Sequence, residues 1–285
     1  MPLVRVGDVS LHVTVAGEGE PLMLLHGFTG SGAQWANQVD AFAGRFRTIA
    51  VDLLGHGRSD APADPERYRM ERCVVDLRTL ADALSVERAC WLGYSMGARV
   101  ALAFALRHPS RVRALVLEGV APGIEDPLMR RQRIVDDEAL ADRIERDGVE
   151  PFVEDWMRQP LFASQARLGK AFLAAARAAR CANSAAGLAN TLRAMGTGAQ
   201  EPLWGQLSTL APPTLLVVGE EDMKFRAIAE AMALRTPGAE IAIIPQAGHA
   251  AHLENAGAFN ACVLRFLTEA PFETANSKQR ATSVA

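Results

Sequence analysis

The strongest constraint on the fold is a short motif, Gly93-Tyr94-Ser95-Met96-Gly97, which separates two apolar segments. Residues 89–92 before it have the length and composition of a buried strand, and the segment from Arg99 onward resembles a buried helix. Glycines two positions before and after a serine let the chain turn back sharply between strand and helix. The serine is then held under strain, with its hydroxyl exposed at the helix N-terminus. The pattern therefore predicts a nucleophile elbow at Ser95.

The composition excludes several classes of protein. Hydrophobic residues make up 49% of the 285 residues and charged residues 22%, so the chain can bury a large core. A net charge of −3 and a pI near 6.1 provide no basic surface for nucleic acid. Four widely separated cysteines predict neither a disulfide framework nor a metal site. Neither a signal peptide nor a membrane-spanning run is recognisable, so we expect a cytoplasmic protein that acts on small molecules.

Short apolar runs alternate with helical segments along most of the chain. They cover residues 11–15, 21–25, 48–51, 90–93, 114–117, 214–218 and 240–244. Continuous apolar runs of this length are typical of a parallel sheet that is buried on both faces. We therefore predict an α/β fold, with a core formed by residues 1–121 and 201–270. Residues 122–200 show helical periodicity without a strand and predict an inserted helical cap, whereas the polar tail 271–285 is expected to be disordered.

Partners for Ser95 are sought at the carboxyl ends of strands, where the working residues of open parallel sheets lie. Asp222 and His249 each follow an apolar run, in the chain order serine, aspartate, histidine. A histidine can accept the serine proton while a carboxylate holds its other ring nitrogen. The sequence thus predicts a triad of Ser95, Asp222 and His249. The alternatives are a helix-capping role for Asp222 with His249 as an ordinary loop histidine, or Glu118 or Glu221 as the acid.

A turn rich in small residues, residues 26–31, follows an earlier strand. The backbone N–H groups of Phe28 in this turn and of Met96 at the elbow are predicted to form an oxyanion hole. We interpret His26 as a structural hydrogen-bonding residue rather than a proton carrier. A second glycine-broken turn, residues 52–59, is expected to support the oxyanion loop.

Arginines indicate an anionic ligand. Residues 159–200 contain no acidic residue but five basic ones, namely Arg167, Lys170, Arg177, Arg180 and Arg193. Lys170, Arg177 and Arg180 share one helical face, which forms either a basic surface stripe or part of a ligand site. Arg99 lies one turn after Ser95 on an apolar helix, where an unpaired guanidinium is costly. It either pairs with an acid such as Glu118 or binds a substrate carboxylate.

Several motifs together resemble 2-succinyl-6-hydroxy-2,4-cyclohexadiene-1-carboxylate synthase of menaquinone biosynthesis, a member of the α/β-hydrolase superfamily. They span nearly the whole chain and lie at residues 93–99, 154–156, 160–164, 195–198, 219–225 and 247–249. One departure is Ala98, where that family usually has glycine. The resemblance implies an α/β-hydrolase fold with a helical cap, the triad Ser95, Asp222 and His249, and no metal or organic cofactor.

The resemblance also implies a substrate site. Its residues are carboxylate-binding arginines and two aromatic lining residues, namely Arg99, Arg131, Arg180, Tyr94 and Trp156. Arg130 and Arg133 compete with Arg131 because they lie in the same run.

The reaction of that family is an elimination rather than a hydrolysis. It removes pyruvate from 2-succinyl-5-enolpyruvyl-6-hydroxy-3-cyclohexene-1-carboxylate, a tricarboxylate, by proton abstraction. The resemblance therefore implies a carbon–oxygen lyase in which Ser95 acts as a base, and we expect a monomer without nucleic-acid or membrane partners. The main alternative is a carboxylesterase or thioesterase that uses the same triad on an anionic acyl substrate. A ligand receptor on a hydrolase fold is a second alternative.

Overall fold

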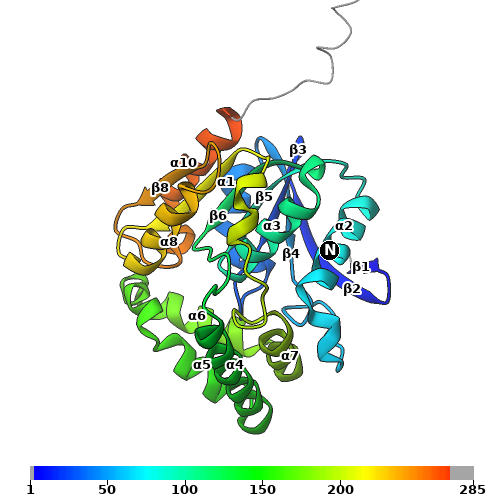
Figure 1. Ribbon diagram of the computed structural model, residues 1–285, viewed down its shortest axis with the longest axis vertical. Helices are drawn as coiled ribbons and strands as arrows, with labels where there is room; N and C mark the ends of the chain where they lie inside the picture. The colour runs from blue at the N-terminus through cyan, green and yellow to red at the C-terminus, as the bar shows by residue number, and fades with distance from the viewer. Residues whose placement is uncertain (1–2, 270–285) are drawn as a thin grey trace, which may run out of the picture.

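The computed structural model describes residues 3–269, which are built around one eight-stranded sheet (Figure 1). The strand order is β1-β2-β4-β3-β5-β6-β7-β8. The strands are β1 (Leu3–Val6), β2 (Val9–Ala16), β3 (Glu20–Leu25), β4 (Phe46–Val51), β5 (Ala89–Tyr94), β6 (Val112–Glu118), β7 (Thr214–Gly219) and β8 (Glu240–Ile244). All neighbours from β4 to β8 pair in parallel, whereas β2 is antiparallel to both β1 and β4. The prediction of a mostly parallel sheet is confirmed.

Helices cover both faces of this sheet. They are α1 (Ala36–Phe42), α2 (Met70–Ala83), α3 (Met96–Arg107), α4 (Pro127–Asp147), α5 (Val149–Met157), α6 (Gly169–Cys181), α7 (Ala185–Met195), α8 (Met223–Ala233), α9 (Ala251–Glu254) and α10 (Ala256–Glu269). Short 3-10 helices are η1 (Gly32–Trp35), η2 (Pro65–Tyr68), η3 (Pro109–Arg111), η4 (Pro160–Leu168) and η5 (Trp204–Thr209). Apolar residues of α2, α3 and α8 join one core cluster, and those of α1 and α10 join another.

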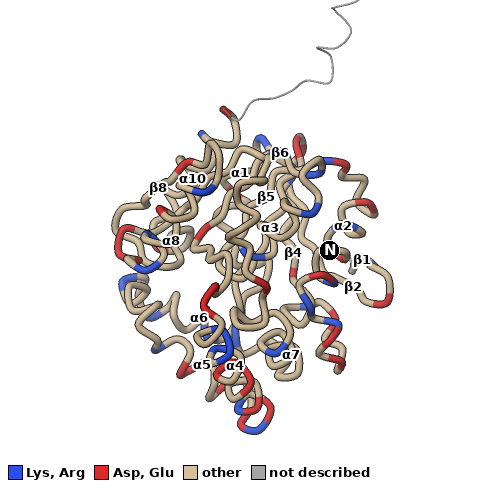
Figure 2. Tube along the Cα trace, viewed as in Figure 1, with Lys and Arg blue, Asp and Glu red and all other residues tan. Residues whose placement is uncertain are grey.

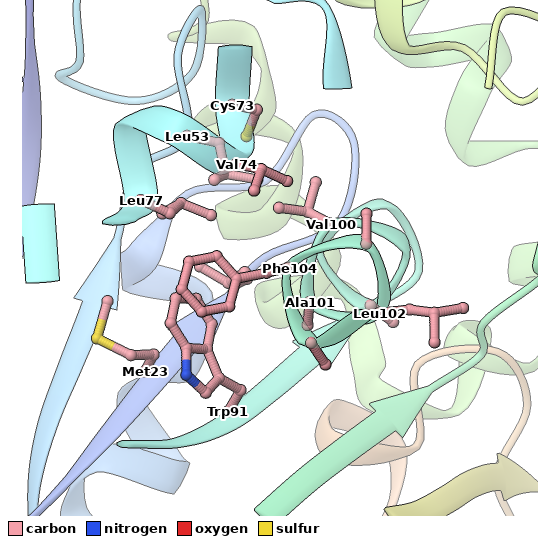
Figure 3. Packing of buried hydrophobic residues seen from close by; sticks show 14 of the residues in the cluster. Met23, Leu53, Cys73, Val74, Leu77, Trp91, Val100, Ala101, Leu102 and Phe104 are labelled. Atoms are coloured by element: carbon pink, nitrogen blue, oxygen red, sulfur yellow. The ribbon is translucent and has the colours of Figure 1, made fainter. Parts of the chain in front are cut away.

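Helix α3 is fixed against the sheet by close aromatic packing (Figure 3). Trp91 of β5 stacks on Phe104 of α3, with ring centroids 4.0 Å apart and ring planes inclined by 27°. Leu77 of α2 is buried in the same cluster. Large buried aromatic pairs of this kind contribute several kcal/mol through burial alone. The packing fixes α3 relative to β5, the two elements that the elbow joins.

The sequence analysis does not predict β1. This strand has only four residues, it pairs with β2 alone, and Leu3 is exposed. A short edge strand buries little apolar surface, so its hydrophobic pattern is weak. The other seven strands contain the predicted runs.

Helices α4 to α7 come between β6 and β7 in the sequence, and in space they gather beyond one end of the sheet (Figure 1). Residues 119–213 contain no strand. Buried apolar side chains hold these helices together, including Ile144 of α4, Phe152 of α5 and Leu188 of α7. The helices fall within the predicted cap, whose extent of residues 122–200 stays a prediction. The predicted tail 271–285 lies outside the described residues.

Basic residues in the second half of the helical insertion pair with acidic residues of other segments. Helix α4 carries both basic and acidic residues (Figure 2). Arg193 of α7 forms ion pairs with Glu138, Asp142 and Glu145 of α4 at 2.6–2.9 Å. The positive charge of residues 159–200, which contain no acidic residue, is thus partly neutralised by acidic residues of α4. No helix within residues 3–269 is long and apolar enough to cross a membrane.

Candidate functional site

Ser95 occupies the sharp turn between β5 and α3. Its backbone has φ 51° and ψ −106°, in a region that non-glycine residues rarely adopt. The Ser95 N–H donates to the Glu118 carbonyl at the end of β6, at 2.8 Å. A β-carbon on Gly93 would overlap the Gly97 carbonyl, and one on Gly97 would overlap the Leu25 carbonyl. Both glycines are therefore required sterically, as expected for a nucleophile elbow.

Ser95, His249 and Asp222 form a continuous hydrogen-bonded series. His249 Nε2 lies 3.2 Å from Ser95 Oγ, and His249 Nδ1 lies 2.7 Å from Asp222 Oδ2. Asp222 Oδ1 also accepts the Phe225 N–H at 3.3 Å, so Asp222 caps α8 as well as holding the histidine. The histidine and the aspartate are both buried. This arrangement can move a proton between the serine oxygen and the imidazole.

The two alternative acids have other partners. Both carboxylate oxygens of Glu118 lie near His252 Nδ1, at 2.8 and 3.0 Å. Glu221 is on the surface and forms an ion pair with Arg167 at 2.6 Å. Neither carboxylate is hydrogen-bonded to His249, so Asp222 is the acid that the geometry favours.

A buried glutamate that the sequence analysis did not single out holds the loop of His249. Glu254 Oε2 accepts the Gly248 N–H at 2.8 Å, and Glu254 Oε1 accepts the Ala250 N–H at 3.2 Å. The two bonds flank His249 on both sides. The side chain of Glu254 is only 1% exposed, so the carboxylate is well placed to fix the loop.

We expect Glu254→Ala to lower kcat by about tenfold with little change in KM, because hydrogen bonds to a charged group contribute about 1.5–3 kcal/mol each and hold His249 in place. Glu254→Gln keeps one acceptor oxygen and should lose less activity. Steady-state kinetics at several pH values test this, with the exposed Glu230→Ala as control. An unchanged kcat in Glu254→Ala would contradict a positioning role.

The loop that follows β3 carries Phe28. His26 donates from Nδ1 to the Gly27 carbonyl at 2.8 Å, while its Nε2 accepts the Leu53 N–H at 3.0 Å. Burial lowers the pKa of His26, which keeps the imidazole neutral in this arrangement. The structural role predicted for His26 is confirmed.

Asp52 connects the same loop to the turn at residues 52–59. Its Oδ1 accepts the Gly32 N–H at 2.6 Å, and its Oδ2 accepts the Arg58 N–H at 2.9 Å. Within residues 3–269, the N–H groups of Phe28 and Met96 donate to no protein acceptor. Both residues line the cavity described below. Two free donors at a cavity wall are what an oxyanion requires.

His56 packs against His26 and Phe28 of the loop that follows β3. Its ring centroid is 5.1 Å from that of His26 and 5.8 Å from that of Phe28. Burial, followed by the neighbouring His26, lowers the pKa of His56 from 6.5 to about 3. The unfolded state therefore binds a proton at a higher pH than the folded state does. The stability contributed by neutral His56 is complete above pH 6.5 and is lost as the pH falls toward 3.

We expect the free energy of unfolding to fall by up to about 1.4 kcal/mol per pH unit across this window because of His56. His56→Asn keeps a donor near the Leu54 carbonyl but cannot titrate, so its stability should depend less steeply on pH. Chemical denaturation between pH 7 and 4 measures the slope. His108→Asn is the control: His108 is only partly buried and has no side-chain hydrogen bond among the described residues, so this variant should keep most of the wild-type slope.

A cavity of about 660 Å³ opens beside the triad. Ser95 and His249 lie on its wall, together with the predicted lining residues Tyr94 and Trp156. The Trp156 ring contacts Phe28, with centroids 5.4 Å apart. Burial raises the pKa of Tyr94 well above its usual range, so its hydroxyl stays protonated. The cavity combines aromatic walls with a nucleophilic centre.

Arg99 reaches this cavity and has neutral partners. One guanidinium nitrogen, Nη1, donates to the Met195 carbonyl at 2.9 Å and to Gln200 Oε1 at 2.8 Å. Within the described residues it forms no ion pair, so the alternative pairing with Glu118 is not realised. Burial lowers the pKa of Arg99 to about 10, which leaves it charged at neutral pH. A buried cation without a carboxylate partner is a candidate anion site.

The predicted basic face of α6 is divided between surface and cavity. Arg180 lines the cavity, donates from Nη1 to the Ala176 carbonyl at 3.3 Å, and leaves its buried Nε without a protein partner. Burial lowers the pKa of Arg180. Arg177 is partly exposed and pairs with Glu154 at 3.0 Å, whereas Lys170 is exposed; neither lines the cavity. Of these three, only Arg180 is placed to contact a ligand.

The structure contradicts the expectation for Arg131. Its side chain is exposed and does not line the cavity, whereas Arg133 does and pairs with Asp137 at 2.8 Å. Two positions along an α-helix differ by about 200° around its axis, so these arginines point to opposite sides of α4. Arg130 is instead bound to Glu201 at 2.7 Å. Arg133 is thus the cavity arginine of this run.

Comparison with known proteins gives a consistent family. A family model for the alpha/beta hydrolase fold matches residues 20–256. A Bacillus subtilis (strain 168) protein, provisionally named 2-succinyl-6-hydroxy-2,4-cyclohexadiene-1-carboxylate synthase, is 44% identical over 93% of this chain and 97% of its own. A Klebsiella pneumoniae synthase of that name is 36% identical over 86% and 93%. The solved structure of MenH from S. aureus superposes with a TM-score of 0.86 and 33% identity, covering 91% of this chain and 98% of that one.

Proposed function

Because the chain belongs to the α/β-hydrolase family and, within it, to the 2-succinyl-6-hydroxy-2,4-cyclohexadiene-1-carboxylate synthases, we propose that it performs their reaction. It is a lyase of menaquinone biosynthesis that eliminates pyruvate from 2-succinyl-5-enolpyruvyl-6-hydroxy-3-cyclohexene-1-carboxylate. The product is 2-succinyl-6-hydroxy-2,4-cyclohexadiene-1-carboxylate.

The observation that carries the proposal is a pair of arginines in the cavity wall beside the triad. Arg99 and Arg180 line the cavity without a carboxylate partner among the described residues. A buried guanidinium left in this state is costly until an anion binds it. A tricarboxylate substrate supplies such anions, whereas a neutral ester does not. The cavity thus favours the elimination substrate over that of a simple esterase.

In the proposed mechanism Ser95 acts as a base. His249 Nε2 takes the Ser95 hydroxyl proton, and Asp222 stabilises the resulting imidazolium through Nδ1. The serine oxygen then removes a proton from the cyclohexene ring. The electron pair shifts the ring double bonds and breaks the carbon–oxygen bond to the enolpyruvyl group, which leaves and is protonated to pyruvate.

The oxyanion hole and the side chains of the cavity wall support this step. The free N–H groups of Phe28 and Met96 stabilise the charge that develops on the succinyl ketone oxygen. Single donors of this kind are typically worth about 10²–10³ in rate. Arg99 and Arg180 hold substrate carboxylates, Arg133 lies in the cavity wall paired with Asp137, and Tyr94 and Trp156 pack against the ring. The proposal also includes a cytoplasmic, monomeric enzyme without cofactor, metal or nucleic-acid partner, in which residues 122–200 act as a substrate-binding cap.

Pyruvate release tests the proposal directly. The purified protein is mixed with the enolpyruvyl substrate, and pyruvate is followed with lactate dehydrogenase and NADH. Release at a rate well above the substrate's spontaneous decay supports the function. A protein that releases no pyruvate but hydrolyses aryl esters or thioesters would favour the esterase alternative.

A further inference from the structure

Lysine is rare in this chain, and one of its few lysines lies in the cavity. The sequence has 30 lysine and arginine residues, of which only Lys170, Lys224 and Lys278 are lysines. Lys224 lies in the first turn of α8, two residues after Asp222, and is part of the cavity lining. In a chain that otherwise uses arginine for positive charge, a cavity lysine suggests a task for a compact ammonium group.

Lys224 approaches an aromatic ring that packs beside His249. Its Nζ lies 5.6 Å from the centre of the Phe225 ring. That ring is in turn 4.5 Å from the ring of His249, centroid to centroid. Lys224 therefore occupies the wall of the cavity that also carries the catalytic histidine. Within residues 3–269, Lys224 forms no ion pair, and its side chain is exposed.

Three cations on the cavity wall have no ion-pair partner among the described residues. Apart from His249, the charged lining residues are Arg99, Arg133, Asp136, Asp137, Arg180 and Lys224. The Arg133 charge is compensated by Asp137, at 2.8 Å. Within the described part of the chain, Arg99, Arg180 and Lys224 have no carboxylate within 4.0 Å. Asp136 is also on the wall and accepts a hydrogen bond from Gln132 at 2.9 Å, so the lining carries two more positive than negative charges. The three cations without a carboxylate partner are available to a substrate that bears three carboxylates.

We propose that Lys224 binds one of the three substrate carboxylates and so contributes to specificity for a tricarboxylate. This inference rests on the proposed function. Lys224 is more exposed than Arg99, so its ammonium remains hydrated until the substrate enters. A flexible lysine can follow the carboxylate as the leaving group departs, whereas a forked guanidinium imposes one geometry. Its location at the N-terminus of α8 adds favourable potential for an anion.

The test compares Lys224→Met and Lys224→Arg with Lys170→Met, a control that removes an exposed lysine away from the cavity. We expect Lys224→Met to raise KM for pyruvate release by about tenfold, which corresponds to about 1.4 kcal/mol, with kcat reduced by less than about threefold. Lys224→Arg should restore KM to within about threefold, since the charge remains. The dependence of kcat/KM on ionic strength should become shallower in Lys224→Met but not in the control.

The possible outcomes distinguish a failure of the inference from a failure of the proposed function. If the wild-type protein releases pyruvate and Lys224→Met retains its KM and salt dependence, the role of Lys224 is wrong while the function stands. If kcat falls with KM unchanged, Lys224 acts through Phe225 and His249 rather than on the substrate, which also overturns the inference. If the wild-type protein releases no pyruvate, the proposed function fails and the inference fails with it. Melting temperatures of all variants show whether a change reflects folding.

Discussion

Ser95→Ala and His249→Ala are each expected to lower kcat for pyruvate release by about 10³-fold or more, and the double variant should be little worse than either. The serine oxygen cannot act as a base without the imidazole 3.2 Å away, and the imidazole has no task without the serine. Residues that act as a unit lose their contribution together. Steady-state kinetics of the three variants measure the effect.

Two controls sharpen this experiment. Asp222→Asn keeps the size of the side chain and should lose activity because an amide cannot stabilise the imidazolium. Melting temperatures should show that Ser95→Ala remains folded. The substitution removes only one hydroxyl group, and alanine adopts the same positive φ at the same cost as serine. Strictly additive losses in the double variant would contradict a shared role of serine and histidine.

Arg99→Ala is expected to lower kcat/KM for pyruvate release by about 10- to 100-fold or more, because charge-assisted hydrogen bonds to a carboxylate contribute about 1.5–3 kcal/mol each. Arg99→Lys should rescue it only in part, because an ammonium cannot reproduce a bidentate fork. Hydrolysis of a small neutral ester should change far less, since that substrate has no carboxylate. The comparison of the two activities separates substrate binding from damage to the triad.

Arg131→Ala is the matched control for this experiment. Arg131 is an exposed arginine on α4 that does not line the cavity, so its removal should leave both activities close to wild type. Arg99 also holds the Met195 carbonyl and Gln200, and its loss could loosen the end of α7. An equal fall of both activities in Arg99→Ala, with a marked drop in melting temperature, would indicate a structural role and refute substrate binding.

The elbow and the hydrogen-bonded triad could be predicted because each of the triad residues follows a recognisable strand in the sequence. Ser95 and Asp222 each follow a buried apolar strand, His249 follows the apolar but partly exposed β8, and the ends of parallel strands meet at one edge of the sheet. The glycines of the elbow carried further information, because Gly93 and Gly97 have no room for a side chain. In this part of the chain, local pattern and three-dimensional position are tightly coupled.

The helical insertion was less predictable, because the rotation of a helix about its axis depends on its packing. Helix α4 exposes Leu128 and Val135 while burying Ile144, so its apolar pattern does not show which side faces the cavity. The sequence therefore could not choose Arg133 over Arg131. Glu254 and Lys224 were missed for another reason. Their roles follow from neighbours that only the folded chain brings together, namely the loop of His249 and the ring of Phe225.

The most direct test of the central claim, that Ser95 removes a proton rather than attacking a carbonyl, is intact-mass spectrometry of the enzyme quenched during steady turnover. Pyruvate is counted in the same samples. We predict one pyruvate for each substrate molecule consumed and an enzyme mass that stays unmodified throughout, because a base forms no covalent bond to the substrate. An adduct that accumulates in the wild-type protein, maps to Ser95 and disappears in Ser95→Ala would contradict the account and indicate acyl transfer.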